Sequence, residues 1–458
     1  MSKMGKLFGT DGIRGITWDY PFTPDFIRKI GYAASLVLPK YKKAAAGKPV
    51  VLLGMDSRAS GKLIKKYLVE GLGASKFKVV DLGIIPTPAV AYLVKREKAD
   101  FGIVISASHN PPEFNGIKFF SAEGLKLSED IEEKIEKLLL GKKPLAFRPS
   151  HPGLHKKDFT RDYEDFLKAT LPPGFTLKGL KILLDCANGA AYKIAPRIFR
   201  DLGATIKVIG DKPDGANINV GCGALHTEKM AKAAADWGAF CGISLDGDAD
   251  RCMFADEKGG ALDGDDIVSI AAPYLKKKGR LTNNGVSLTF MSNYGLIRYL
   301  EDAGISVAQV PVGDKNVTDA MEKGDLKLGG ESSGHIIFRE FAPTGDGVLT
   351  ALQTLAAVRD IGRPFSWFRR HWKRYPQVLE KVKVSGKPAL KDVAGFSAKL
   401  TKCEAALKGN GRIFIRYSGT EPLLRLLVEG ESRPKIKAIA DELLEHYRKH
   451  SGALAGKN

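Results

Sequence analysis

Three carboxylates at alternate positions of one loop carry the strongest chemical signal in this sequence. Asp246, Asp248 and Asp250 follow the apolar run Cys241 to Leu245, which is long enough for a buried strand. Carboxylates spaced in this way can converge on one hard cation, and Mg²⁺ prefers oxygen ligands and often shares its shell with a phosphate. We therefore predict a magnesium site on a solvent-exposed loop, with Arg251 beside it as a partner for an anion.

A calcium-binding EF-hand is the competing interpretation of the same three aspartates. In such a loop the sixth position is glycine and the twelfth is a bidentate glutamate. Here the sixth position is Arg251, and the twelfth, Glu257, lies in a turn with apolar neighbours. The pattern fits a magnesium site next to a phosphate better.

A second polar segment runs from Ser106 to Lys118 and contains Ser108, His109 and Asn110. A serine acts as a nucleophile or phosphate carrier at neutral pH only with a neighbouring base or metal. His109 and Lys118 are the nearest candidates. A simple polar turn is the alternative, because Ser, Asn and Pro are common in turns.

Two further loops could bind a ligand. In Gly329 to His335, the side chains of Glu331, Ser333 and His335 offer donors and acceptors suited to sugar hydroxyls. A flexible turn explains this segment nearly as well. In the fourth loop, the residues Arg416, Ser418, Gly419, Thr420 and Arg425 form a pattern typical of an anion cradle. A β-turn with surface arginines is the alternative there.

The elements that position these loops follow from the hydrophobic pattern. Continuous apolar runs that end in polar loops alternate with helical patterns, which predicts α/β units with buried, largely parallel strands. The runs begin at residues 50, 101, 181, 241 and 286. Ligands of such sheets bind at the carboxyl ends of the strands, where these polar loops lie.

The last part of the chain has another pattern. Val378 to Val384, Arg412 to Tyr417 and Leu423 to Val428 are predicted strands, and Arg433 to His450 is a predicted amphipathic helix. An α+β domain is therefore expected at the C-terminal end.

Composition excludes several classes of protein. The 458 residues are 44% hydrophobic and 27% charged, as in globular proteins, and no apolar stretch is long enough to span a bilayer. Five scattered cysteines form no CxxC pair, and no secretory signal is visible, so we expect a reducing, cytoplasmic location.

Lys and Arg total 71 against 52 Asp and Glu, a net charge of +19. The basic residues are dispersed, so we expect a solvated basic surface or an anionic substrate and no nucleic-acid or membrane partner.

Taken in order, the four loops resemble those of the α-D-phosphohexomutase superfamily, and the resemblance covers nearly the whole chain. Further matching segments are Leu7 to Gly15, Ile105 to Phe120, Pro213 to Gly215, Asn217 to Asn219, Met291 to Asn293, Gly313-Asp314 and Thr344 to Gly347. The closest resemblance is to the bacterial members that act on glucosamine phosphate.

The resemblance implies a fold and a reaction. Three doubly wound α/β domains and a C-terminal α+β domain would surround a central cleft, with domains at 1–158, 159–262, 263–373 and 374–458. A phosphorylated serine would convert glucosamine 6-phosphate to glucosamine 1-phosphate through a sugar 1,6-bisphosphate and supply amino-sugar nucleotide synthesis. A phosphomannomutase/phosphoglucomutase is the alternative. Partners would be the phosphosugar and, in a homodimer, a second copy of the chain.

The resemblance also implies roles for individual residues. Ser108 would carry the phosphoryl group, and Ser108, Asp246, Asp248 and Asp250 would bind Mg²⁺. The reaction centre would be lined by Arg14, His109, Lys118 and Arg251, with Lys118 as the general acid/base. Sugar hydroxyls would contact Glu331, Ser333 and His335. The phosphate that is not transferred would be bound by Arg416, Ser418, Gly419, Thr420 and Arg425.

Three positions depart from the pattern of the glucosamine enzymes. Ala249 replaces a usual glycine in the loop Asp246 to Arg251, which we call the metal loop. Ser332 replaces a common glutamine in the loop Gly329 to His335, which we call the sugar loop, and Ala224 to Thr227 replaces Ser-Thr-His-Pro. Ser332 bears on the choice of sugar and leaves the reaction class unchanged.

A phosphatase and a non-catalytic anion binder are competing functions for the same residues. Hydrolysis of a phosphoserine would need an open, wet site, whereas a cleft with a phosphate clamp favours transfer to a sugar. A binder would not need Ser108 and the three aspartates. Both functions are therefore less consistent with the sequence than a mutase.

Overall fold

The computed structural model describes residues 7–9, 11–41, 49–74, 77–143, 145–150, 152–418 and 422–451. The chain forms two compact units. The first comprises Met1–Thr289 and Gly304–His371, and the second comprises Phe290–Ala303 and Trp372–Asn458. None of the described helices is long and apolar enough to cross a membrane.

The first unit begins with a six-stranded sheet in the order β1-β5-β4-β2-β3-β6. Its strands are β1 (Ile13–Ile16), β2 (Val50–Met55), β3 (Lys78–Ile84), β4 (Phe101–Ile105), β5 (Phe114–Phe120) and β6 (Leu154–Lys156). The strands β2, β3, β4 and β6 are parallel, whereas β5 runs antiparallel to both β4 and β1. The sheet is therefore mixed at one edge.

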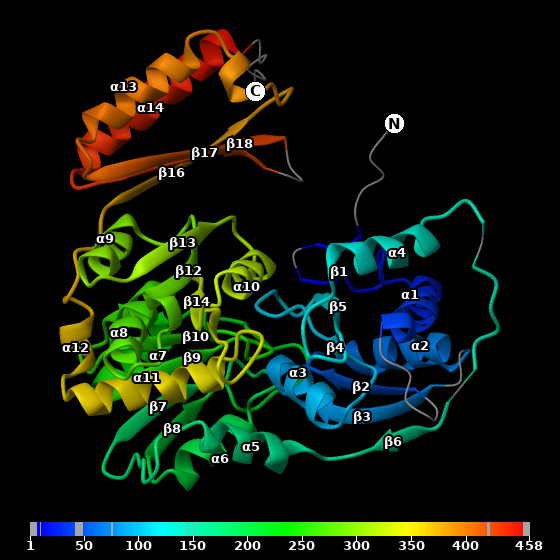
Figure 1. Cartoon of the computed structure of the whole chain (residues 1–458). Helices are drawn as coiled ribbons and strands as arrows, with labels where there is room; N and C mark the ends of the chain where they lie inside the picture. Colours follow the sequence, from blue (N-terminus) through cyan, green and yellow to red (C-terminus); the bar gives the residue numbers. More distant parts are fainter. Residues whose placement is uncertain are drawn as a thin grey trace. The chain divides into compact units, whose positions relative to one another are not determined.

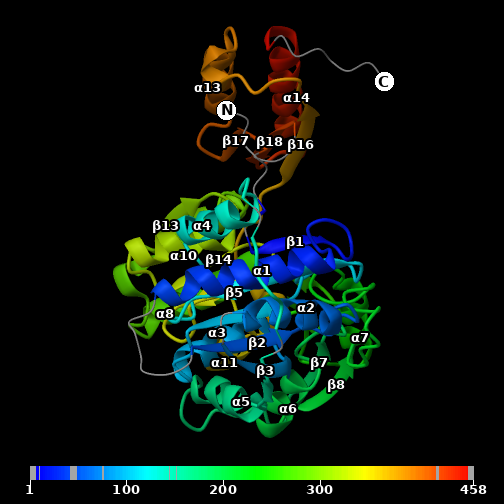
Figure 2. The same cartoon turned by 90° about the vertical axis from the view of Figure 1, so that its right-hand side faces the viewer.

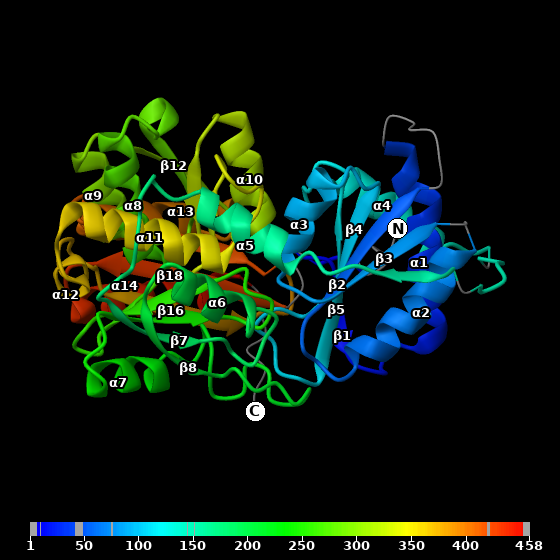
Figure 3. The same ribbon diagram turned by 90° about the horizontal axis from the view of Figure 1, so that it is seen from below.

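Helices cover both faces of this sheet. One face packs against α1 (Pro24–Val37), α2 (Gly61–Gly73) and α4 (Glu129–Leu139), and the opposite face packs against α3 (Thr87–Arg96), as Figure 3 shows for α1, α2 and α3. Burial on both faces explains why β2 and β4 are continuously apolar.

A five-stranded sheet follows in the order β11-β10-β9-β7-β8. Its strands are β7 (Lys181–Asp185), β8 (Thr205–Ile209), β9 (Cys241–Leu245), β10 (Cys252–Ala255) and β11 (Ala261–Leu262). The accompanying helices are α5 (Thr160–Ala169), α6 (Ile194–Asp201) and α7 (Glu228–Asp236). Met230, Ala231 and Ala234 of α7 pack on Leu183 of β7.

The third sheet has the order β13-β12-β14-β15. It consists of β12 (Gly285–Thr289), β13 (Ser306–Val310), β14 (Leu328–Gly330) and β15 (Ile336–Phe338), with helices α8 (Gly264–Lys277), α10 (Asp314–Lys323), α11 (Gly347–Ile361) and α12 (Phe365–Phe368). Helix α11 is buried from Gly347 to Val358 and contacts both β9 and β10 of the second sheet and β15 of the third. It thus connects two sheets within the first unit.

The α/β prediction is confirmed. All five apolar runs form strands, namely β2, β4, β7, β9 and β12, and each ends in its polar loop. The antiparallel strands β5, β10 and β15 lack the long apolar runs and were not predicted. The predicted domain boundaries after residues 158, 262 and 373 stay predictions.

The second unit contains a three-stranded antiparallel sheet, β16 (Gln377–Lys383), β18 (Leu423–Gly430) and β17 (Gly411–Tyr417), in that order. Helices α13 (Phe396–Ala406) and α14 (Arg433–His450) cover one face of the sheet and lie side by side (Figures 1 and 2). The three strands and the amphipathic helix predicted here are confirmed.

Helix α9 (Tyr294–Asp302) also belongs to the second unit. The buried carboxylate of Glu429 accepts hydrogen bonds from the Tyr294 N–H at 3.0 Å and from Gln377 Nε2 at 2.8 Å. Its other oxygen pairs with Arg412, whose guanidinium also donates to the Phe290 carbonyl at 3.0 Å. Because Asn293 Oδ1 accepts the Tyr375 N–H at 2.9 Å, the start of α9 is tied to the C-terminal strands at several points.

Candidate active site

Ser108 and Lys118 are brought together by a β-hairpin. Ser108 lies in the loop directly after β4, and the chain returns as β5, where Lys118 pairs with Val104 of β4. The sequence interpretation treated this segment as one polar loop. The structure places Lys118 in a buried strand, so its position is set by the register of the sheet.

The hydroxyl of Ser108 points at the metal loop. Its Oγ donates a hydrogen bond to Asp246 Oδ2 at 2.7 Å and lies 3.3 Å from His109 Nδ1. Ser108 is 1% exposed and adopts a φ of 53°, a left-handed conformation that is uncommon for a residue with a side chain. The serine is therefore held in an unusual backbone conformation next to a carboxylate and an imidazole.

The three aspartates form one buried cluster, contrary to the expectation of an exposed loop. One carboxylate oxygen from each of Asp246, Asp248 and Asp250 lies within 4.8 Å of the others, and each residue is at most 4% exposed. The Asp248 Oδ1 and Asp250 Oδ1 atoms are buried and have no hydrogen-bond partner among the described residues. Because a buried carboxylate oxygen is costly without a partner, these atoms fit a bound cation.

The electrostatics of the cluster differ from one aspartate to the next. Burial and then the charges of Asp250 and Asp248 raise the pKa of Asp246 well above its usual value. Burial also acts to raise the pKa of Asp250, but the nearby Lys118 ammonium and the His335 ring outweigh it and hold that pKa well below its usual range. The crowding of like charges around Asp246 is the repulsion that a divalent cation relieves.

Lys118 supplies positive charge to the same cluster. Its Nζ lies 2.7 Å from Asp248 Oδ2, 2.6 Å from Asp11 Oδ2 and 3.5 Å from Asp250 Oδ2. Burial acts to lower the pKa of Lys118, but the three carboxylates outweigh it and raise that pKa above its ordinary value. The lysine is thus held as an ammonium ion.

Two arginines and a histidine complete the surroundings. The Nε atoms of Arg14 and Arg251 are buried and have no hydrogen-bond partner among the described residues. Arg14 also pairs with Asp11 at 2.5 Å. Burial, followed by the charges of Arg251 and Arg14, lowers the pKa of His109 to about 4, so the imidazole is neutral near pH 7. Arg251 Nε lies 3.8 Å from Asp250 Oδ1, an ion pair too long for a hydrogen bond. Buried N–H donors on two cations that form no hydrogen bond are what an anion would satisfy.

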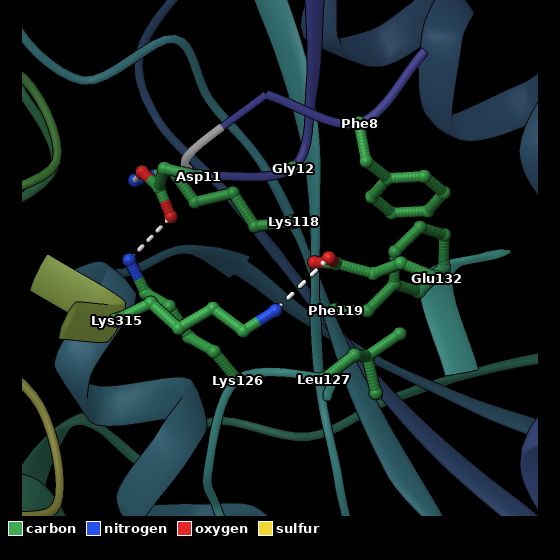
Figure 4. A pocket seen from close by; sticks show the side chains of 9 residues that line it. All are labelled: Phe8, Asp11, Gly12, Lys118, Phe119, Lys126, Leu127, Glu132 and Lys315. Carbon is green, nitrogen blue, oxygen red and sulfur yellow. Dashed lines mark hydrogen bonds and ion pairs between the residues drawn. The ribbon is translucent and has the colours of Figure 1, made fainter. Parts of the chain in front are cut away.

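Figure 4 shows a pocket beside this cluster. It is lined by residues of the segment before β1, of β5 and the chain that follows it, and of helices α4 and α10. Lys126 pairs there with Asp11 at 2.5 Å and also with Asp314, and Lys315 pairs with Glu132 at 3.0 Å. Burial acts to raise the pKa of Asp11, but Lys118 and Lys126 outweigh it and hold it well below its usual range. Sequence reasoning gave Asp11 no role, although it lies in the matching segment Leu7 to Gly15.

Thr87 is a second residue that sequence reasoning missed. Its Oγ1 donates to Asp248 Oδ2 at 2.5 Å, and its N–H donates to the Asp248 carbonyl at 3.0 Å. Thr87 opens α3 and lies between two prolines, so the segment Pro86-Thr87-Pro88 at the end of β3 was the available signal.

The sugar loop contacts the metal loop directly. His335 is 3% exposed, and its Nδ1 lies 3.7 Å from Asp250 Oδ2, while the Gly345 N–H donates to its Nε2 at 3.2 Å. Glu331 accepts from the Gly313 N–H at 3.0 Å and from Ser333 Oγ at 3.1 Å. The structure thus brings the predicted sugar-binding residues next to the aspartates through His335.

The fourth loop lies in the second unit and is described by itself. Arg416 of β17 and Arg425 of β18 are direct cross-strand partners, and Lys381 of β16 is the partner of Arg425 on its other side. Direct partners point to the same face of a sheet, and this face is opposite the one covered by the helices. Like charges opposite each other are unfavourable, so this row of three cations is typical of an anion site.

Two of the residues predicted for this loop, Gly419 and Thr420, lie outside the described residues. Ser418 is buried, and its N–H donates to the Leu423 carbonyl at 2.8 Å. Its own carbonyl accepts from Lys387 Nζ at 2.5 Å. Lys381 was missed because nothing in the sequence indicates which residue of β16 faces Arg425.

The sequence matches known proteins over nearly its full length. Domains I, II, III and the C-terminal domain of phosphoglucomutase/phosphomannomutase match residues 5–144, 162–260, 263–375 and 379–446. Phosphoglucosamine mutase from Caldicellulosiruptor bescii is 46% identical over 447 residues, covering 96% of this chain and 98% of the relative. That of Syntrophotalea carbinolica is 43% identical over 451 residues and covers 98% of each chain.

Solved structures share the fold. A phosphoglucomutase/phosphomannomutase family protein from Burkholderia thailandensis has a TM-score of 0.79 at 22% identity and covers 99% of this chain and 98% of its own. N-acetylphosphoglucosamine mutase from Aspergillus fumigatus, solved with GlcNAc-6P and magnesium, has a TM-score of 0.67 at 19% identity, covering 97% and 95%. The four domains, the curated relatives and the site geometry agree: the chain belongs to the phosphoglucomutase/phosphomannomutase family and, within it, to the phosphoglucosamine mutases.

Proposed function

We propose that the protein interconverts glucosamine 6-phosphate and glucosamine 1-phosphate through a phosphorylated Ser108. One observation carries the proposal, namely two opposite kinds of buried atoms near Ser108 that lack a hydrogen-bond partner among the described residues. Asp248 Oδ1 is available to a cation and Arg14 Nε to an anion, while Asp250 Oδ1 and Arg251 Nε have only each other, at 3.8 Å. A metal ion and a phosphoryl group together would satisfy both kinds.

Phosphoryl transfer is governed by positioning and charge stabilisation, and this site is built for both. In the first step the bond between phosphorus and Ser108 Oγ breaks, and a bond forms to the free hydroxyl oxygen of the bound sugar monophosphate. The hydroxyl proton leaves, and Ser108 Oγ takes up a proton, so charge and protons balance. The second step is the reverse transfer from the other end of the sugar, which regenerates phosphorylated Ser108.

Two residues are proposed for the proton transfers. In the second step Ser108 Oγ attacks and loses its proton, and the neutral His109, whose Nδ1 lies 3.3 Å from this oxygen, can accept it. Lys118, predicted as the general acid/base, is an ammonium ion in the carboxylate cluster and can donate a proton to the sugar oxygen that leaves phosphorus in this step. In the first step both proton transfers run in the reverse direction, so that Ser108 Oγ receives its proton from His109 and the sugar hydroxyl gives its proton to Lys118.

Asp246, Asp248, Asp250 and an oxygen of Ser108 would hold Mg²⁺, and the buried oxygens without partners fit an oxygen-seeking cation. When bound, the ion offsets the negative charge of the phosphoryl group in transfer. Arg14 and Arg251 would contact the same group through their Nε donors, which form no hydrogen bond among the described residues.

The phosphate that is not transferred would bind to Arg416, Ser418, Gly419, Thr420 and Arg425, and we add Lys381 to this set. The cation row of Lys381, Arg425 and Arg416 supports this assignment because an anion between like charges removes their repulsion. Glu331, Ser333 and His335 would contact the sugar hydroxyls. The sugar 1,6-bisphosphate would reorient between the two steps. Each of its phosphates would then lie in turn at Ser108, where transfer occurs, and at the site formed by Arg416 and Arg425.

Glucosamine phosphate is proposed as the substrate because the chain is similar over its full length to curated phosphoglucosamine mutases. A phosphomannomutase/phosphoglucomutase is the second candidate, and Ser332 favours it. This residue lies in the sugar loop, where a glutamine is common in the glucosamine enzymes. A shorter side chain in this loop would relax the discrimination between sugar phosphates.

Parallel assays test the proposal. Conversion of glucosamine, glucose and mannose 6-phosphates is measured with Mg²⁺ and a trace of sugar 1,6-bisphosphate, in wild type and Ser332→Gln. We expect the highest kcat/KM for glucosamine phosphate and a sharper preference in Ser332→Gln. A preference for glucose or mannose phosphate contradicts the substrate. Release of inorganic phosphate without isomerisation would indicate a phosphatase, and binding without turnover would indicate a sugar-phosphate binder. A homodimer remains a prediction that light scattering checks.

A further inference from the structure

Ser108 depends on groups behind its loop to keep its backbone in the left-handed region. A φ of 53° places the backbone where a side chain is disfavoured, and such conformations persist only when the surroundings impose them. The Oγ–Asp246 contact acts on the side chain and does not fix the peptide groups on either side. The restraint on the backbone must come from elsewhere.

Arg58 provides most of this restraint. Its side chain is completely buried, and its Nη2 donates to the carbonyls of Ser108 at 3.1 Å and Asn110 at 2.7 Å. Its Nη1 donates to the Phe114 carbonyl at 3.0 Å and also to the carbonyl of Pro111. The remaining donor, Nε, binds Asp56, so all five N–H groups of the guanidinium are used.

Asp56 extends the same restraint to the other side of Ser108. Its Oδ2 accepts the hydroxyl of Ser106 at 2.7 Å, and this hydroxyl accepts the Ser108 N–H at 2.9 Å. The buried ion pair of Arg58 and Asp56, directly after β2, therefore binds the Ser108 carbonyl directly through Arg58 and restrains the Ser108 N–H indirectly, through the Ser106 hydroxyl.

Asn219, in the chain between β8 and α7, binds the same loop from the second α/β region. Its Nδ2 donates to the Ser108 carbonyl at 2.9 Å and to the Asn110 carbonyl at 3.0 Å. The backbone of Gly247 also lies against this carbonyl, since a Cβ at Gly247 would come within 2.6 Å of the Ser108 oxygen and 2.8 Å of Asn219 Nδ2. The serine loop and the metal loop thus meet where Asn219 binds.

We propose that Arg58 and Asn219 are positioning residues for phosphoryl transfer, which act only through the backbone of the Ser108 loop. Among the described residues, neither side chain forms a hydrogen bond or ion pair with Ser108 Oγ or with Asp246, Asp248 and Asp250. Together they fix the direction in which Ser108 Oγ projects from the loop. The inference rests on the proposed function, because the direction of Oγ matters only if Ser108 takes part in in-line phosphoryl transfer.

Arg58→Lys and Asn219→Asp are the informative variants. Lysine keeps the charge that balances Asp56 but cannot donate to four carbonyls at once. Aspartate keeps the shape of asparagine and replaces the donor with an acceptor that faces two carbonyl oxygens. Arg28→Lys and Asn217→Asp are matched controls, since Arg28 pairs with Glu70 between α1 and α2, and Asn217 donates to the Lys212 carbonyl.

Because a misplacement of about 1 Å can reduce a rate about 100-fold, we expect kcat to fall ten- to 100-fold in each variant, with KM within about threefold. The phosphoserine should also lose a larger share of its phosphate to water per turnover. This ratio is measured by mass spectrometry of Ser108 together with released inorganic phosphate. A loss of thermal stability alone would not change it.

The proposal is overturned if kcat and the loss to water in both variants match those of the controls at comparable melting temperatures. Phosphorylation of Ser108 by glucose 1,6-bisphosphate serves as a readout that does not depend on the sugar specificity. If the wild type is phosphorylated in this way but does not convert glucosamine phosphate, only the proposed substrate fails. If Ser108 is never phosphorylated in the wild type, both proposals fail.

Discussion

The Ser108 loop and the Arg416–Arg425 strand pair are both proposed to handle a phosphate, yet they are built in opposite ways. In the serine loop Ser106 to Ser108 are buried, and hydrogen bonds from Arg58 and Asn219 fix the backbone. The two arginines lie half-buried on neighbouring strands, on the sheet face opposite α13 and α14. Bond making requires a fixed geometry, whereas binding an anion requires charge that can adapt. Substitutions should therefore affect kcat in the first region and KM in the second.

The largest effect is expected from Ser108→Ala and Ser108→Gly. Both remove the phosphoryl carrier, and glycine also suits the left-handed backbone, so a defect shared by the two reports on the hydroxyl. We expect a loss of about 10⁴-fold or more in kcat, as for the removal of other nucleophiles. Steady-state assays and phosphopeptide mapping check this, with Ser121→Ala as the control. Full activity in either Ser108 variant would exclude the serine as carrier.

Asp248→Asn should have the next largest effect. The change removes one charge from the metal cluster and weakens the pairing with Lys118, so kcat should fall about 100-fold or more and the Mg²⁺ requirement should rise. Asp256→Asn is the control, because Asp256 is equally buried but pairs with Arg369 outside the cluster. The control should lose stability and keep its kcat. Equal activity of the wild type in EDTA and in Mg²⁺ would refute the metal role.

Arg425→Ala tests the other side of the comparison. Loss of a charged hydrogen bond to the phosphate should raise KM about ten- to 100-fold and leave kcat nearly unchanged. Lys381→Ala should raise KM less, by about two- to fivefold, because an exposed lysine contributes a point charge in water. Lys383→Ala, further along the same strand, should change neither constant. A fall in kcat with constant KM in Arg425→Ala would show that the two regions do not differ as described.

The smallest effect is expected from Ala249→Gly. Ala249 lies in the metal loop with a φ of 59°, where glycine has no steric penalty, but the variant also loses a buried methyl group. We expect an increase of about 0.5 kcal/mol in stability and a change in activity of less than about twofold. Thermal unfolding checks this against Ala235→Gly in α7, which should lose about 1 kcal/mol. Equal losses in the two variants would mean that no strain is stored at Ala249.

Sequence patterns predicted the elements whose signal is local. The apolar runs of β2, β4, β7, β9 and β12 and the face of α14 were all recognisable because burial on both faces, or on one helical face, leaves a clear periodicity. Strand β5 was missed because Asn115, Gly116 and Lys118 interrupt its apolar pattern. The polar residues are buried there because they bind groups from other segments, as Asn115 does with Ser60 at 2.8 Å.

The same limit applies to the site. Ser108 and the three aspartates were recognised from their types and spacing, but Asp11, Thr87, Arg58 and Asn219 become significant only through contacts with distant residues. The expected exposure of the aspartates was wrong for a related reason. Lys118, Thr87 and His335 come from three separate segments and bury the cluster. Burial by residues that are distant in sequence cannot be predicted from a local pattern.

The hydrogen bonds around Glu429 bear on how this chain can be divided or recombined. A fragment that starts at residue 376 would keep the three-stranded sheet with α13 and α14 but would lose α9, Asn293 and Tyr375. Glu429 would then lack its Tyr294 donor, and the Arg412 guanidinium would lack the Phe290 carbonyl. An exchange of C-terminal segments between homologous enzymes should therefore include residues 290–303 together with 372–458. These two stretches of chain form one exchangeable module, although 68 residues separate them in the sequence.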